Sequence, residues 1–90
     1  MKEVQIYTTP FCSYCVRAKR LLQSRGIQYT EINAVGNPEL RAWLREKSGQ
    51  HTVPQIFIGD VSIGGYTELS LLDRRGALLP MLAGDEEEET

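Results

Sequence analysis

The chain has 90 residues, of which 41% are hydrophobic and 24% are charged, and its formal net charge is −2. This length and composition predict one small globular domain rather than a fibrous or disordered chain. Because the chain has no basic excess and no apolar run near the roughly 20 residues that cross a bilayer, we expect neither a nucleic-acid nor a membrane partner.

The first half of the chain predicts a strand, a helix and a second strand. Residues 3–7 alternate apolar and polar side chains, which is typical of a strand. From Ser13 the apolar residues recur at helical spacing, and Gly26 is the kind of residue that follows a helix end. Residues 27–32 are rich in β-formers, so this half predicts a right-handed βαβ unit with parallel strands. The helix side chains that would face the core are Cys15, Ala18, Leu21 and Leu22.

A second helix is predicted by its end signals. Asn37 is a favourable cap, Pro38 suits the first helical position, and Gly49 ends the pattern. We expect Trp43 to pack rather than to act in catalysis. The buried stripe would consist of Leu40, Trp43 and Leu44.

A β-hairpin and a last helix complete the predicted elements. Residues 55–58 and 61–63 flank a Gly-Asp dipeptide, which predicts a tight hairpin. After a glycine pair, residues 68–75 predict a helix that Gly76 ends, and a short final turn follows. The side chains expected to pack from these last segments are Leu69, Leu71, Leu72, Leu78, Leu79 and Leu82.

The order of elements, β-α-β-α-β-β-α, resembles the thioredoxin-like fold. The predicted fold class is α/β, with a four-stranded mixed sheet and helices on both faces, and the strand order rests on analogy. We expect this domain to span residues 1–84 and to be followed by an acidic, disordered tail, residues 85–90, whose like charges repel. Residues 1–9 lack the features of a signal peptide, so we expect a cytoplasmic location.

The two cysteines, Cys12 and Cys15, lie between the first predicted strand and the first predicted helix. Unpaired N–H groups and the helix dipole favour a thiolate at the helix start, where Cys12 lies. Cys15 follows one turn later, on the apolar side of the helix. Because the cytosol keeps thiols reduced, a structural disulfide is not expected there. We therefore predict redox catalysis in which Cys12 attacks and Cys15 resolves.

Two other interpretations of the cysteine pair are weaker. A metal site needs about four ligands, whereas the chain offers two cysteines and one histidine, His51, which fits a solvated loop better than a ligand set. Two unrelated buried thiols are the other alternative, and the position between a strand and a helix argues against it. We expect no resident metal.

Three motifs carry a resemblance to a known family. In this order and at this spacing, CSYC (residues 12–15), TVP (52–54) and GG (64–65) resemble glutaredoxins, most closely the small bacterial dithiol class. The resemblance covers nearly the whole chain except the acidic tail. It implies a monomeric oxidoreductase that uses glutathione as co-substrate to reduce glutathionylated and disulfide-containing proteins, with glutathione reductase as an indirect partner.

The resemblance also implies which residues bind glutathione. Pro54 would follow a cis peptide bond and face Cys12, exposing the backbone of Val53 to the cysteine backbone of glutathione. The γ-glutamyl end would lie on the backbone that follows the glycine pair. Arg41 matches a position that can reach the glycyl carboxylate, although an exposed helix arginine is an equal alternative. The implied set is Tyr14, Arg41, Thr52, Val53, Pro54, Gly65, Tyr66, Thr67 and Glu68.

Three residues depart from the family pattern. Ser13 stands where proline is usual, Thr9 where many members carry lysine, and Tyr66 where a small residue is common. We expect each to change glutathione affinity, and none of them removes a reacting group.

Two alternative functions remain open. In some glutaredoxin-like proteins, two chains and two glutathiones hold an iron–sulfur cluster through the active cysteine, and such a cluster scaffold or sensor is the main alternative here. A thioredoxin-type disulfide reductase served by a flavoenzyme is the other. The TVP and GG motifs, which resemble a glutathione site, disfavour it.

Overall fold

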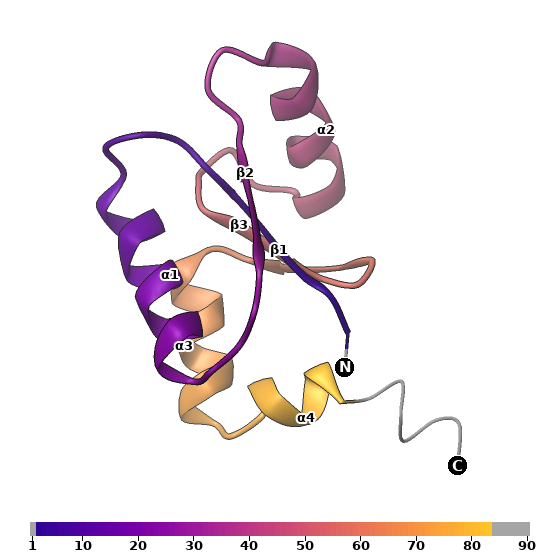
Figure 1. The fold of residues 1–90 in the computed structure, drawn as a ribbon. Coiled ribbons are helices and arrows are strands. Elements are labelled where there is room, and N and C mark those ends of the chain that lie inside the picture. Colours follow the sequence, from indigo (N-terminus) through magenta and orange to yellow (C-terminus); the bar gives the residue numbers. More distant parts are fainter. Residues whose placement is uncertain (1, 84–90) are drawn as a thin grey trace.

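A central four-stranded sheet carries helices on both faces in the computed structural model, which describes residues 2–83 (Figure 1). The predicted acidic tail, residues 85–90, lies outside the described residues. The elements in chain order are β1 (Val4–Thr8), α1 (Ser13–Ser24), β2 (Thr30–Asn33), α2 (Pro38–Ser48), β3 (Gln55–Ile58), β4 (Val61–Gly64), α3 (Tyr66–Arg74) and α4 (Leu78–Leu82).

The strands are arranged in the order β2-β1-β3-β4. β1 pairs in parallel with β2, which confirms the predicted βαβ unit, and antiparallel with β3. β3 and β4 form the predicted antiparallel hairpin. The mixed α/β fold with helices on both faces is therefore as predicted. Because β1 is central, its carboxyl end leads to the middle of one end of the sheet, where Cys12 caps α1 and Cys15 lies in its first turn.

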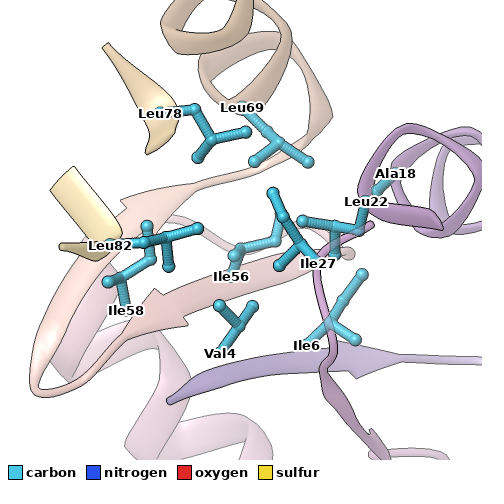
Figure 2. Close-up of a cluster of buried hydrophobic side chains, with 10 residues drawn as sticks. All are labelled: Val4, Ile6, Ala18, Leu22, Ile27, Ile56, Ile58, Leu69, Leu78 and Leu82. Atoms are coloured by element: carbon cyan, nitrogen blue, oxygen red, sulfur yellow. The ribbon is translucent and has the colours of Figure 1, made fainter. Parts of the chain in front are cut away.

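The larger core lies between the sheet and the layer formed by α1, α3 and α4 (Figure 2). Alternate residues of β1 and β3 point into it, and the buried faces of the three helices cover them. Ile27, from the connection after α1, completes it. The buried members are Val4, Ile6, Ala18, Leu22, Ile27, Ile56, Ile58, Leu69, Leu78 and Leu82.

A smaller core lies on the other face of the sheet, under α2. Its buried members are Tyr7, Ala34, Leu44 and Phe57, with Leu40 packed at its edge. Trp43 stacks on Phe57 with ring centroids 5.6 Å apart, as the packing prediction requires, but the prediction that Trp43 is buried is wrong, because it is 39% exposed. The two cores together cover both faces of β1 and β3.

Two predicted element boundaries are wrong, each for a local reason. β2 begins at Thr30 rather than at residue 27, because the Ile27 N–H donates to the carbonyl of Leu22 at 2.9 Å and so finishes α1. α3 begins at Tyr66 rather than at residue 68, because Gly65 already serves as its cap. The predicted cap at Asn37 is confirmed, since its side chain accepts a hydrogen bond from the Leu40 N–H at 3.1 Å.

The packing prediction also fails for two leucines. Leu71 is 41% exposed and Leu79 is 50% exposed, whereas Leu69, Leu78 and Leu82 are buried. The short helices α3 and α4 each turn only one face to the sheet, so leucines on their other faces remain in solvent. None of the helices in residues 2–83 has the length and apolar character to cross a membrane.

The contrast between two leucines of α3 gives a direct test of the core. We expect Leu69→Ala to lower the free energy of unfolding by about 2–5 kcal/mol, because it leaves a cavity in the larger core. Leu71→Ala, the same substitution on the exposed face, should change it by less than about 1 kcal/mol. Urea unfolding of both variants measures the difference, and equal losses would contradict the assigned packing of α3.

Candidate active site

Cys12 lies where α1 begins, at the end of the loop that follows β1. Its backbone is extended, with φ −105° and ψ 111°, and its sulfur accepts a hydrogen bond from the backbone N–H of Cys15 at 3.2 Å. On its other side the thiol donates to the carbonyl oxygen of Val53 at 3.7 Å. The half-buried sulfur is thus held between a helix start and the loop that precedes β3.

Cys15 is buried one turn inside α1, and its side chain is only 2% exposed. Burial, and after it the hydrogen bond with Cys12, raises the pKa of Cys15 to about 12 from an ordinary value of 9.0. The backbone of Thr9 and the ammonium group of Lys19 act in the opposite direction and offset only part of this rise. At neutral pH Cys15 is therefore a protonated, shielded thiol. Its resolving role stays a prediction.

The difference between the two thiols predicts selective alkylation. At pH 7 we expect iodoacetamide to modify Cys12 and leave Cys15 unmodified, because only a thiolate reacts and Cys15 is buried and protonated. The rate at Cys15 should rise about tenfold for each pH unit up to about 12, which is the pKa of its thiol. Mass spectrometry of peptides after timed alkylation gives both rates. Equal labelling of Cys12 and Cys15 at pH 7 would contradict the predicted difference between them. In urea, where the protein is unfolded, the two alkylation rates should become equal.

A groove with a volume of about 250 Å³ runs beside the Val53 loop. One wall is the loop that leads into β3, and the other is the start of α3. The Val53–Pro54 peptide bond is cis, as the family resemblance implies. The residues that line the groove are Tyr14, Gln50, Thr52, Val53, Pro54, Gly65, Tyr66, Thr67 and Glu68. All the predicted glutathione-binding residues except Arg41 are therefore brought together in one place.

Arg41 does not line the groove. Its guanidinium donates from Nη2 to the carbonyl oxygen of His51 at 3.3 Å, so it contacts the backbone just before Thr52. Arg41 thus contacts the loop that leads to one wall of the groove. Direct contact with a ligand carboxylate stays a prediction. His51 is an exposed loop residue, in agreement with its sequence interpretation.

The glycine pair is required by close contacts within the protein. Gly64 has φ +108°, and a Cβ there would lie 2.5 Å from Oε1 of Glu68. A Cβ on Gly65 would lie 3.2 Å from the carbonyl oxygen of Pro54. The Gly65 N–H donates to Oε1 of Glu68 at 2.6 Å, which joins the first turn of α3 to its own start. The pair therefore lets α3 begin directly against the Pro54 loop.

Tyrosine rings form the outer wall of the groove. The rings of Tyr14 and Tyr66 lie with centroids 6.2 Å apart, and the guanidinium of Arg17 lies 5.3 Å from the centroid of the Tyr14 ring. Tyr66, one of the departures from the family pattern, thus extends an aromatic surface that begins between the two cysteines. Arg17 adds a positive charge to the edge of this surface.

Residues on the other side of Cys12 form a separate, smaller cavity of about 180 Å³. Thr9 lines this cavity together with both cysteines, so a lysine at this position would lie near Cys12. Phe11 also lines it, is fully exposed, and adopts φ +60°, a left-handed conformation that is uncommon outside glycine. The sequence interpretation did not single out Phe11.

Gln50 is a second residue that sequence reasoning missed. It lines the groove, and its side-chain Nε2 donates to Oε1 of Glu68 at 3.4 Å, from the opposite wall. Its only sequence signal is its place two residues before the TVP motif, in a loop that any polar residue could occupy. Metal-binding groups of three or more histidine, cysteine and carboxylate side chains are absent from the described part of the chain.

Comparisons with known proteins agree with this geometry. The glutaredoxin family model matches residues 4–63. The glutaredoxin of Pseudomonas aeruginosa is 51% identical over 83 residues, which cover 92% of this chain and 99% of that protein. Among solved structures, the glutaredoxin of Brucella melitensis is 50% identical, with a TM-score of 0.82, and the match covers 91% of this chain and 89% of that one.

A more distant solved structure shares the fold equally well. The buckwheat glutaredoxin–glutathione complex is 32% identical, with a TM-score of 0.86, and the match covers 92% of this chain and 78% of that one. The family model, the sequence relatives and the fold all indicate the same family. The chain therefore belongs to the glutaredoxin family.

Proposed function

We propose that this chain is a glutathione-dependent thiol–disulfide oxidoreductase that acts on glutathione mixed disulfides and on protein disulfides. The observation that carries the proposal is the position of the Cys12 sulfur, 3.7 Å from the Val53 carbonyl at the edge of the groove. Family membership supports thiol–disulfide exchange in general. The buckwheat relative, crystallised with glutathione, supports a glutathione site.

The groove offers partners for each end of a glutathionyl group. Val53 lines the groove, and its backbone groups can pair with a peptide backbone as an added strand does. The N–H groups of Tyr66 and Thr67 precede the first hydrogen bond of α3, from the Leu69 N–H to the Gly65 carbonyl at 3.0 Å. Such a helix start favours a carboxylate. A glutathionyl group with its carboxylate there and its backbone on Val53 would present its sulfur to Cys12.

The reaction with a glutathionylated protein needs only Cys12. Its thiolate attacks the glutathionyl sulfur, the old disulfide bond breaks, and the substrate leaves as a thiolate that takes up a proton. A second glutathione, as thiolate, then attacks the glutathionyl sulfur of the Cys12 mixed disulfide. This step releases oxidised glutathione and restores the Cys12 thiolate.

A protein disulfide needs both cysteines. After Cys12 has attacked, Cys15 gives up its proton and attacks the Cys12 sulfur, which releases the reduced substrate and closes a Cys12–Cys15 disulfide. Two glutathiones reopen this disulfide in successive exchanges. We place the activity in the cytoplasm and in a monomer, in line with the sequence-based expectations.

A coupled assay tests the proposed function. We expect the protein to reduce a glutathionylated peptide at a rate that depends on glutathione, with oxidised glutathione as the product. Replacing glutathione and its reductase by a thioredoxin-reducing flavoenzyme should give no turnover. Turnover with the flavoenzyme and none with glutathione would show a thioredoxin-type reductase and refute the proposal.

The iron–sulfur alternative leads to a different expectation. A cluster held by thiolates needs four of them, and only Cys12 of the two thiols in each chain is accessible, so two chains and two glutathiones would have to complete the set. After anaerobic reconstitution with iron, sulfide and glutathione, we expect a colourless monomer. A brown dimer whose visible absorbance requires glutathione, and which Cys12→Ser loses, would favour the cluster function instead.

A further inference from the structure

Gln55 is a buried glutamine at the start of β3, directly after Pro54. Its side chain is 1% exposed and lies on the same face of the sheet as Phe57, a member of the smaller apolar core. Its amide nitrogen donates two hydrogen bonds, to the carbonyl oxygen of Thr52 at 2.9 Å and to Oε1 of Gln50 at 2.8 Å. Both partners line the groove, whereas Gln55 itself does not.

The hydrogen bonds continue across the groove. Gln50 donates from Nε2 to Oε1 of Glu68 at 3.4 Å, and the same oxygen accepts the N–H of Gly65 at 2.6 Å. The series therefore runs from the buried strand β3, through the loop on one wall, to the first turn of α3 on the other wall. It joins segments that are far apart in the sequence and that must face each other across a bound ligand.

The orientation of both amides is fixed by the ends of this series. The Thr52 carbonyl and the Glu68 carboxylate can only accept, so Gln55 must turn its NH₂ group to Thr52 and Gln50 must turn its NH₂ group to Glu68. The amide oxygen of Gln50 then points toward Gln55 and accepts a hydrogen bond from the second N–H of the Gln55 amide. Flipping either amide would break the series.

This arrangement leaves one buried polar atom without a partner. Oε1 of Gln55 is fully buried and makes no hydrogen bond within the described part of the chain. A buried acceptor of this kind destabilises a fold, and an apolar residue of similar length would remove it. Folding alone therefore does not account for a glutamine at this position, whereas holding the groove does.

We propose that Gln55 is a positioning residue for glutathione: through Thr52 and Gln50 it fixes the two walls of the groove at the spacing that a glutathionyl group requires. This inference rests on the proposed function. It assigns to a residue outside the groove a share of the selectivity for glutathione over other thiols. Gln55 acts on binding and leaves the reacting sulfur of Cys12 untouched.

A matched pair of substrates tests the proposal. One peptide is prepared as its mixed disulfide with glutathione and as its mixed disulfide with 2-mercaptoethanol, and each is reacted with the reduced protein in single turnovers. For Gln55→Met we expect the half-saturating concentration of the glutathionylated peptide to rise about tenfold, with the maximal rate within about twofold of wild type. The rate with the mercaptoethanol form should not change. Gln28→Met, at an exposed position away from the groove, is the matched control.

The melting temperature separates positioning from folding. Because Gln55→Met removes the unpartnered acceptor together with two hydrogen bonds, we expect its Tm within about 4 °C of wild type. A lowered Tm with unchanged saturation by the glutathionylated peptide would give Gln55 a purely structural role and overturn the proposal. In the double variant with Gln50→Met, the half-saturating concentration of the glutathionylated peptide should rise by less than the product of the two single increases, since both residues act in one series. Independent effects would refute the link through Gln50.

The same experiment distinguishes failure of this proposal from failure of the proposed function. If wild type reacts equally well with both forms of the peptide, the glutathione site itself is wrong. If wild type prefers the glutathionylated form and Gln55→Met keeps that preference in full, the glutathione site stands and Gln55 has no part in it.

Discussion

Cys12→Ser should abolish glutathione-dependent reduction of every disulfide substrate, with a loss of about 10³-fold or more. The Cys12 sulfur is the one that lies at the edge of the groove, held 3.2 Å from the Cys15 N–H and 3.7 Å from the Val53 carbonyl. A serine hydroxyl is far too weakly acidic to replace it as a nucleophile. Cys15 cannot substitute either, because it is 2% exposed and its pKa is raised to about 12.

The measurement is the initial rate on a glutathionylated peptide, followed through the oxidised glutathione that forms. Arg20→Ala is a suitable control, because it alters an exposed residue of the same helix that lines neither cavity and removes no thiol. Far-UV circular dichroism and the melting temperature should show that Cys12→Ser is folded. A folded Cys12→Ser protein with substantial activity would mean that another group carries the reaction.

The features that follow from local sequence were predicted well. The change from alternating to helical spacing at Ser13 places the cysteine pair at a strand–helix junction, and the structure confirms it. The cap at Asn37 and the stop at Gly49, which adopts φ +72°, are likewise local and likewise confirmed. Each of these depends on residues within about one helical turn of one another.

The boundary error at residue 27 is local, whereas the errors in burial depend on contacts between distant segments. A β-rich run suggested a strand from residue 27, but the Ile27 N–H donates back to the Leu22 carbonyl, just after α1 ends at Ser24. Leu71 and Leu79 fit an apolar pattern, yet the sheet lies against the other faces of their helices. Periodicity shows that a face is apolar and does not show which neighbour covers it.

The candidate site was predicted from motifs, and its supporting contacts were not. The groove gathers Thr52, Val53 and Pro54 with the residues after the glycine pair, as the family resemblance implied. The bridge from Gln55 through Gln50 to Glu68 spans side chains up to 18 positions apart, between types that are common on any surface. No short sequence motif predicts such a series of hydrogen bonds, because the series exists only once β3 and α3 have been brought together.

Cys15→Ser should separate the two routes of the reaction. The hydrogen bond to the Cys12 sulfur comes from the backbone N–H of residue 15, so it survives the substitution. Cys12 should therefore still remove glutathione from a glutathionylated peptide, at a rate within a few-fold of wild type. The reduction of a protein disulfide should fall by about 10²-fold or more, because glutathione in solution must replace a thiol one helical turn away. Intramolecular attack of this kind has a very large effective concentration.

The prediction is tested by measuring both substrates with the same preparation. During reduction of a protein disulfide, mass spectrometry should show the substrate accumulating as a mixed disulfide on Cys12, since the step that releases it has lost its nucleophile. Cys15→Ala should behave in the same way, because it also keeps the backbone N–H and lacks the thiol. If both variants reduce the protein disulfide as fast as wild type, glutathione alone resolves the intermediate, and the buried thiol of Cys15 has no role in turnover.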